Sequence, residues 1–150
     1  MSITEQLVED LKSAMKAQDE VTKGAIRLIR AAVKNAEIEK GRELDDEGAL
    51  DVLARMAKQH RDSIAAYRQH GREDLAAQEE AELAVVSRYL PEQMGEDEIR
   101  ALAQQVVTEL GASGPGDRGK VMGRLMPQLK GRADGNAVNR IVGELLGQGA

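Results

Sequence analysis

The residues that best match a chemical motif are Gly114, Gly119 and Lys120, which fit the G-x-x-x-x-G-K frame of a phosphate-binding loop. In that motif a Ser or Thr follows the lysine and contacts Mg²⁺, whereas this sequence has Val121. The motif also needs a preceding strand, and the residues before it have a helical pattern. The sequence therefore predicts no ATP site and no cofactor. A glycine-rich segment that leads into a helix can still receive a phosphate through its backbone N–H groups.

The same region is the most basic part of an acidic protein. Between Asp117 and Arg140 there are six basic and two acidic residues, a local charge of +4 where the whole chain has −5. Cations bind phosphates, and glycine lets a backbone come close to them. We therefore predict a nucleic-acid-binding surface with these members: Arg118, Gly119, Lys120, Gly123, Arg124, Lys130, Gly131 and Arg132. The alternative is an ordinary solvated helix face that balances nearby carboxylates.

The histidines give a weaker pattern. His60 and His70 lie too far apart on one expected helix for the i, i+4 spacing of a metal-binding pair. His60 and Ser63 are close enough in sequence to touch, but a hydrolytic pair also needs an orienting acid and an oxyanion hole, and no residue marks either. We therefore expect surface histidines and predict no catalytic residue.

The acids Glu79, Glu80 and Glu82 form a cluster that could bind a cation. An acidic cluster on a helix is more often solvated or paired with Arg or Lys. The sequence accordingly predicts no metal site.

Composition excludes several classes of protein. The chain has no Cys, Phe or Trp and only two Tyr, so disulfides and Cys-ligated metal centres are excluded. The stacking platforms that hold single-stranded nucleic acid need aromatic residues, which are nearly absent. No apolar run is long enough to cross a membrane, and the first ten residues do not have the pattern of a signal peptide. No membrane partner is expected, and the expected location is the cytoplasm.

Good helix formers dominate, and strand-like alternation never extends beyond a few positions, so the sequence predicts an all-α fold. An N-terminal domain over residues 1–92 has about four helices, expected at about 3–18, between Asp19 and Gly41, between Asp45 or Asp46 and Gly71, and at about 73–90. Pro91–Glu96 is the expected boundary, because residues 1–90 hold 4 Gly and residues 91–150 hold 11. A small domain over 96–150 has three helices, the second ending near Pro127 or Gly131.

The chain resembles the YqeY-like proteins of the GatB/YqeY group over nearly its whole length. The first segments that carry the resemblance are Lys58-Gln59 with Asp62-Ser63, Gly71 to Leu75, Glu79 and Glu82, and Tyr89 to Gln93. In the second domain they are Gly119 to Gly123, Met126-Pro127, Lys130 to Gly135, and Val138-Asn139. One position departs from the pattern: His60 stands where an arginine is expected.

The second domain also resembles the C-terminal tail of the B subunit of glutamyl/aspartyl-tRNA amidotransferase. That tail holds the outer part of a tRNA, and its enzyme is a carbon–nitrogen ligase with glutamine as amide donor. The resemblance implies a tRNA-contacting or translation-associated accessory protein, not a ligase by itself. The implied partners are tRNA and an amidotransferase or synthetase protein. The alternative is a protein–protein adaptor with no nucleic-acid role, whose long N-terminal helices bind an enzyme partner.

Overall fold

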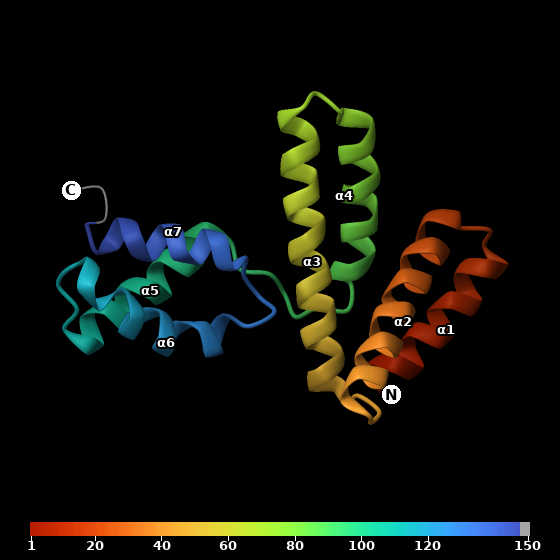
Figure 1. Cartoon of the computed structure of the whole chain (residues 1–150), viewed down its shortest axis with the longest axis horizontal. Helices are drawn as coiled ribbons and strands as arrows, with labels where there is room; N and C mark the ends of the chain where they lie inside the picture. Colours follow the sequence, from red (N-terminus) through yellow and green to blue (C-terminus); the bar gives the residue numbers. More distant parts are fainter. Residues whose placement is uncertain (148–150) are drawn as a thin grey trace. The chain divides into compact units, whose positions relative to one another are not determined.

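The computed structural model describes residues 1–147, and this part of the chain contains helices and turns but no strand (Figure 1). The predicted all-α fold is confirmed. Its elements, in chain order, are α1 (Ile3–Lys16), α2 (Glu20–Lys40), α3 (Asp46–Gln69), α4 (Glu73–Ser87), α5 (Glu96–Leu110), the 3-10 turn η1 (Pro115–Asp117), α6 (Arg118–Leu129) and α7 (Gly135–Leu145). Among the described residues, no helix has both the length and the apolar character that a bilayer span requires.

The chain forms two compact units, Met1–Pro91 and Glu92–Ala150. The residues just after Pro91 belong to the second unit because they donate hydrogen bonds to the turn between α6 and α7. The Met94 N–H donates to the Arg132 carbonyl at 2.8 Å, and the Gln93 amide donates to the Gly131 carbonyl at 2.7 Å. Independent folding of the predicted domains 1–92 and 96–150 stays a prediction, which limited proteolysis between them tests.

Helix starts in the first unit follow the caps expected from the sequence. Ser2 and Glu5 form a capping box, in which the Glu5 N–H donates to the Ser2 hydroxyl at 3.1 Å. The Asp45 carboxylate accepts the Gly48 N–H at 2.8 Å and so fixes the start of α3. At the end of α2, Gly41 adopts a left-handed conformation with φ of 70°, which glycine reaches without steric cost.

Proline lies near the ends of two helices and affects them differently. The fourth helix ends at Ser87 instead of near Leu90, and the residues that follow form i→i−3 bonds. Pro91 has no N–H to continue the helix and pushes Leu90 out of the helical region, so the last turn tightens. In contrast, α6 continues through Pro127 to Leu129, because Pro127 lies in its final turn and forgoes only the bond to the Gly123 carbonyl.

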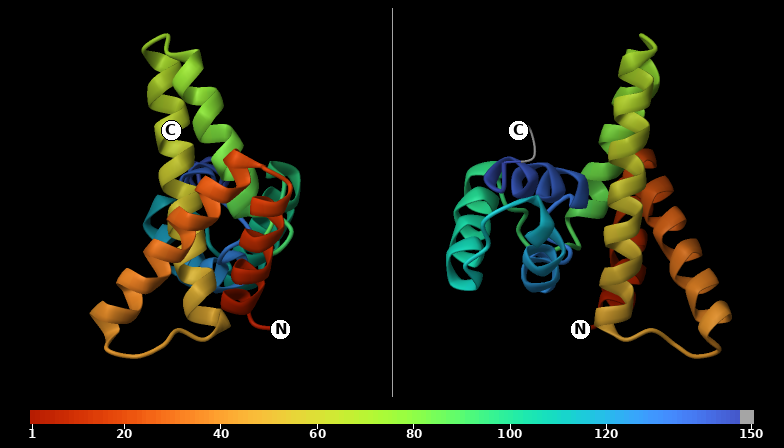
Figure 2. Two further views of the ribbon diagram at one scale, coloured as in Figure 1. Left: turned by 90° about the vertical axis from the view of Figure 1, so that its right-hand side faces the viewer. Right: turned by 60° about the vertical axis from the view of Figure 1, so that its left-hand side comes forward.

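Two helical hairpins make up the first unit. The long helices α3 and α4 run side by side, and α1 lies along α2, which in turn contacts α3 and α4 (Figures 1 and 2). Apolar side chains from all four helices meet in one core. Its largest fully buried members are Leu7, Ile26, Ile29, Leu53, Val85 and Val86.

The second unit is a three-helix arrangement in which α5, α6 and α7 all contact one another. One apolar stripe of each helix faces a shared core. From α6 this stripe is Val121, Leu125 and Leu129, each with no exposed surface. Since these residues recur every four positions, the opposite side of α6 faces solvent.

Candidate nucleic-acid interface

The exposed side of α6 brings together four of the eight residues predicted to bind nucleic acid. Gly119, Lys120, Gly123 and Arg124 are all exposed and follow one another along consecutive turns of the helix. Their face is opposite the buried stripe that anchors α6 in the core. Two cations and two bare backbone positions therefore share one solvent-facing side.

Arg118 and Arg132 are fixed by bonds to backbone carbonyls. The Arg118 guanidinium donates to the Asn139 carbonyl at 3.2 Å, which joins the start of α6 to α7. The Arg132 guanidinium donates to the Glu92 carbonyl at 3.3 Å. A carbonyl does not neutralise a guanidinium, and an arginine has five N–H donors, so the bond to Glu92 alone leaves Arg132 with further donors.

The remaining predicted residues, Lys130 and Gly131, lie in the turn after α6. At 1.5 Å of rise per residue, Lys120 and Lys130 are about 15 Å apart along the helix axis. The predicted set is therefore two groups: the exposed face of α6, and the turn from Lys130 to Arg132 that bonds to the segment before α5. A ligand that contacts both groups must span the length of α6.

Arg140, which contributed to the positive stretch in the sequence, is engaged in an ion network between α5 and α7. It pairs with Glu96 and, at 3.1 Å, with Glu144, and Glu144 also accepts from Arg100 at 2.6 Å. The bonds from Arg100 and then Arg140 hold the pKa of Glu144 below its ordinary value. The charge of Arg140 is thus neutralised by carboxylates within this unit.

The glycines of the predicted site fall into two classes. Gly131 adopts a left-handed conformation with φ of 75°, so the turn itself requires glycine. At Gly119 and Gly123, apart from the adjacent residues and the backbone of α6 itself, nothing in the described structure lies within 4 Å of the place that a Cβ would occupy. Packing among residues 1–147 therefore does not explain why these two positions lack a side chain.

The phosphate-loop frame from Gly114 to Lys120 has helical surroundings. Helix α5 precedes it where the motif needs a strand, as the sequence predicted. Within the loop, the Asp117 carboxylate accepts the Ser113 N–H at 3.0 Å.

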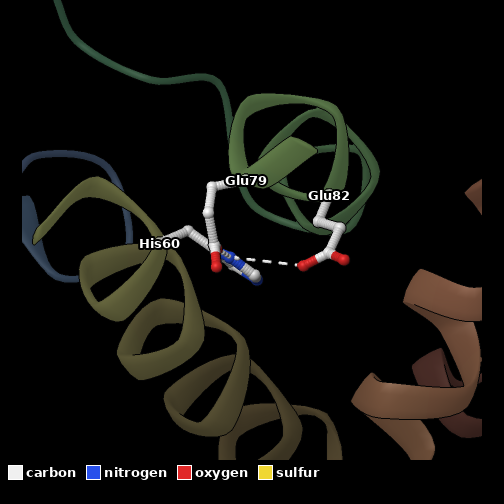
Figure 3. Close-up of side chains that lie close together, drawn as sticks. All are labelled: His60, Glu79 and Glu82. Carbon is white, nitrogen blue, oxygen red and sulfur yellow. Dashed lines mark hydrogen bonds and ion pairs between the residues drawn. The ribbon is translucent and has the colours of Figure 1, made fainter. Parts of the chain in front are cut away.

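The structure also brings together three side chains that were not predicted from the sequence to be in contact (Figure 3). His60 of α3 lies against Glu79 and Glu82 of α4, with His60 Nδ1 2.5 Å from Glu79 Oε2 and 3.8 Å from Glu82 Oε2. The expectation of a surface histidine is wrong for His60, whose side chain is 11% exposed because α4 covers it. Glu80 behaves as expected and pairs with Arg68 at 2.6 Å.

One signal in the sequence pointed to this contact. His60 and Glu82 are equally far from Gly71, the glycine at the turn between the two helices. In an antiparallel hairpin, positions equidistant from the turn face each other. Pairing positions across Gly71 would have placed the histidine beside the acids.

Fold and surface together define a small all-α protein with a charged, glycine-bearing helix face in its second unit. The chain belongs to the YqeY-like family, whose family model matches residues 4–146. The resemblance inferred from the sequence is thus confirmed over nearly the whole chain.

Curated relatives carry the name "Altered inheritance of mitochondria protein 41, mitochondrial". The protein of Lachancea thermotolerans is 36% identical over 112 residues, which are 73% of this chain and 60% of the relative. That of Kluyveromyces lactis is 37% identical over 113 residues, with the same two shares, and that of Pyrenophora tritici-repentis is 33% identical over 145 residues, 95% of this chain and 80% of the relative. The chain thus spans about 60% of the length of the first two relatives.

The relatives' names correct the expected location. A cytoplasmic protein was expected, whereas these relatives are named as mitochondrial proteins, which contradicts the expectation. The expectation rested on the lack of cysteine and of a signal-peptide pattern, and neither property distinguishes one reducing compartment from another.

Proposed function

We propose that this chain is a tRNA-contacting accessory protein of translation that binds RNA phosphates with the exposed face of α6. One observation carries the proposal: Gly119 and Gly123 lie one turn apart, each directly before a cation (Lys120 and Arg124), and no neighbour within the described residues requires them to be glycine. Glycine inside a helix costs about 0.5–1 kcal/mol relative to alanine. A ligand that approaches the helix backbone closely would explain why two glycines occur on this face although each lowers the stability of the helix.

Phosphate is the ligand that this face fits best. Lys120 and Arg124 supply charge, although Arg124 also lies 3.8 Å from the Glu109 carboxylate in an exposed pair. The bare backbone at Gly119 and Gly123 beside them admits a ridge of phosphates to closer range than side chains would allow. The few aromatic residues leave little capacity for stacking bases, so recognition follows backbone shape and charge more than sequence. The resemblance of the second unit to the tail of a tRNA-dependent amidotransferase subunit agrees with tRNA as the ligand.

The proposal assigns amide-transfer chemistry to a partner protein. The enzyme whose tail the second unit resembles is a carbon–nitrogen ligase with glutamine as amide donor. In such a reaction, the proposed role of this chain is to hold the tRNA. An amidotransferase or a synthetase is accordingly the proposed protein partner. A glutaminase assay with ATP and charged tRNA, with and without that partner, tests this division of roles.

The decisive experiment is a tRNA-binding titration at several salt concentrations. Each neutralised phosphate contributes about 0.7–0.9 to the log–log salt slope, so three to five contacts give a slope of about −2 to −4. The double variant Lys120→Ala/Arg124→Ala should flatten this slope by about 1 to 2 and leave helicity unchanged. The matched control is Arg27→Ala/Arg30→Ala, which removes two exposed cations from α2. Equal loss in both double variants means diffuse attraction and contradicts the proposed interface.

A second candidate function is a protein–protein adaptor, which the exposed surface of α2 favours. Leu28 is 51% exposed and Ile38 is 69% exposed, although both are large and apolar. They belong to a stripe of exposed residues spaced alternately three and four apart, the spacing of a helix-pairing seam. The stripe consists of Val21, Gly24, Leu28, Ala31, Asn35 and Ile38.

The variant Leu28→Glu separates the two functions. It places a charge on the α2 stripe without touching the core, so the free energy of unfolding should change by less than about 0.5 kcal/mol. If the chain is an adaptor, this variant loses its amidotransferase or synthetase partner in a pull-down and keeps any tRNA affinity. If the α6 proposal holds alone, Leu28→Glu behaves as wild type in both assays.

A further inference from the structure

We propose that His60, Glu79 and Glu82 form a binding site for a divalent transition-metal ion, with Zn²⁺ as the ion that their chemistry fits best. The site lies between α3 and α4 in the first unit, whereas α6, on which the proposed RNA interface depends, belongs to the second unit. An experiment that contradicts one of the two proposals therefore leaves the other unaffected. Figure 3 shows the three side chains pointing toward one another, one from α3 and two from α4.

The helices present the ligand atoms in a suitable arrangement. Glu79 and Glu82 are three residues apart on α4, so their carboxylates share one face of the helix. His60 enters from α3 with Nδ1 toward both carboxylates, and one ligand atom from each residue lies within 4.8 Å of the other two. Three ligands from two packed helices define one side of a coordination sphere.

The distances suit an ion of this size. A tetrahedral zinc with ligands at about 2.0–2.1 Å places neighbouring ligand atoms about 3.3 Å apart. The two distances from His60 Nδ1, 2.5 Å to Glu79 and 3.8 Å to Glu82, lie on either side of that value. Glu79 must move away by about 0.8 Å and Glu82 must approach by about 0.5 Å, which rotation of the glutamate side chains supplies.

The electrostatics of the cluster favour a cation. The side chains of Glu79 and Glu82 are only 24% and 22% exposed, and a histidine carries a charge only when it is protonated. With a neutral imidazole the cluster holds two negative charges that are largely removed from solvent, and a dication neutralises both. Nearby, the carboxylates of Glu73 and Glu80 are paired with an arginine, Arg68.

The ligand types select among the metals. Imidazole binds Zn²⁺ and other transition ions, whereas Mg²⁺ and Ca²⁺ prefer oxygen ligands alone. Three protein ligands leave a fourth position for water, and the partial exposure of both glutamates gives the ion a path from solvent. Zinc must bind the unprotonated Nδ1, so the ring proton moves to Nε2 or leaves, and binding weakens as the pH falls.

The variant His60→Arg distinguishes a metal site from a plain ion pair. An arginine at this position can pair with both glutamates, so the α3–α4 contact is kept, but a guanidinium cannot ligate a metal. Circular dichroism and the melting temperature without metal check that this variant is folded. His70→Arg is the matched control, because His70 is the exposed residue that ends the same helix.

The experiment is a titration of the full chain with Zn²⁺ by calorimetry, and with Co²⁺ by its visible absorption. Wild type and His70→Arg should bind one ion each and show the bands of tetrahedral Co²⁺, with affinity falling at least tenfold from pH 7.5 to pH 5.5. His60→Arg and Glu79→Gln should lose at least tenfold in Zn²⁺ affinity, and Mg²⁺ should not compete. Absence of saturable binding in wild type, or equal affinity in folded His60→Arg, overturns the proposal.

Discussion

The hydroxyl of Tyr89 donates to the carboxylate of Asp10 at 2.5 Å, although the two residues are 79 positions apart in the sequence. The bond joins α1 to the tight turn that follows α4, so it closes the first unit between its first helix and its last residues. Burial raises the pKa of the Tyr89 hydroxyl well above its ordinary value, and the bond to the Asp10 carboxylate raises it further.

Removing this hydroxyl should destabilise the first unit. Tyr89→Phe keeps the ring but leaves the partly buried Asp10 carboxylate without its donor, which should lower the free energy of unfolding by about 1 kcal/mol. Urea denaturation of both proteins measures the change. Tyr67→Phe is the control, since it alters the other tyrosine by the same atom, and it should change the free energy by less than about 0.5 kcal/mol.

The raised pKa of Tyr89 also predicts how stability depends on alkaline pH. A group whose pKa is higher in the folded protein stabilises the fold below its unfolded pKa, which is about 10 for tyrosine, and loses that contribution as the pH rises further. The stability difference between wild type and Tyr89→Phe should therefore be constant from pH 7 to pH 9 and shrink above pH 10. A difference that grows with alkaline pH contradicts this account of Tyr89.

Most of the fold was predictable because helix formation here depends on neighbours in sequence. The capping residues Ser2, Asp19 and Asp45, and the stop at Gly41, act within a few residues of themselves. The end of α6 at Leu129 lies between its two expected positions, Pro127 and Gly131. The end of α4 was predicted less well, because Pro91 also tightens the turn before it. The Tyr89–Asp10 bond could not be predicted, since it depends on how separate helices pack.

In the candidate sites, too, contacts within one helix were predictable from the sequence and contacts between helices were not. Lys120 and Arg124 share a helix face, as their spacing predicted, because a helix fixes that relationship locally. The pair of Arg140 with Glu144 is likewise local, since the two residues are four apart on α7. Only the pair of Arg140 with Glu96 depends on the packing of α5 against α7. The contact of His60 with Glu79 required the register of two helices, which the turn at Gly71 sets.

Acid should weaken the second unit through Glu144. The bonds from Arg100 and Arg140 lower the pKa of this carboxyl, so the charged form stabilises the fold above its unfolded pKa of about 4.3 and the contribution disappears as the pH falls through the lower folded pKa. Glu144→Gln should therefore melt below wild type at pH 7, and the difference should shrink below pH 4. A difference in melting temperature between the two proteins that stays constant from pH 7 to pH 3 contradicts this assignment.

The two classes of glycine in the predicted site should respond oppositely to alanine. At Gly131, with φ of 75°, alanine should lower the free energy of unfolding by about 1–2 kcal/mol because the left-handed conformation is strained for any residue with a Cβ. At Gly119 and Gly123 the added methyl meets open space, so each alanine should raise the free energy of unfolding by about 0.5–1 kcal/mol. Urea denaturation of the single variants measures both effects.

The proposed RNA interface adds a second expectation for Gly119→Ala/Gly123→Ala. If phosphates approach the backbone of α6, two methyl groups hold them away, and tRNA affinity should fall even though the protein becomes more stable. Gly24→Ala is the matched control, because Gly24 is also exposed within a helix and open to a Cβ, but lies on α2. It should raise stability and leave tRNA affinity unchanged. Because a damaged fold cannot produce greater stability with weaker binding, that combination in the double variant alone assigns the contact to α6, and unchanged affinity removes it from this face.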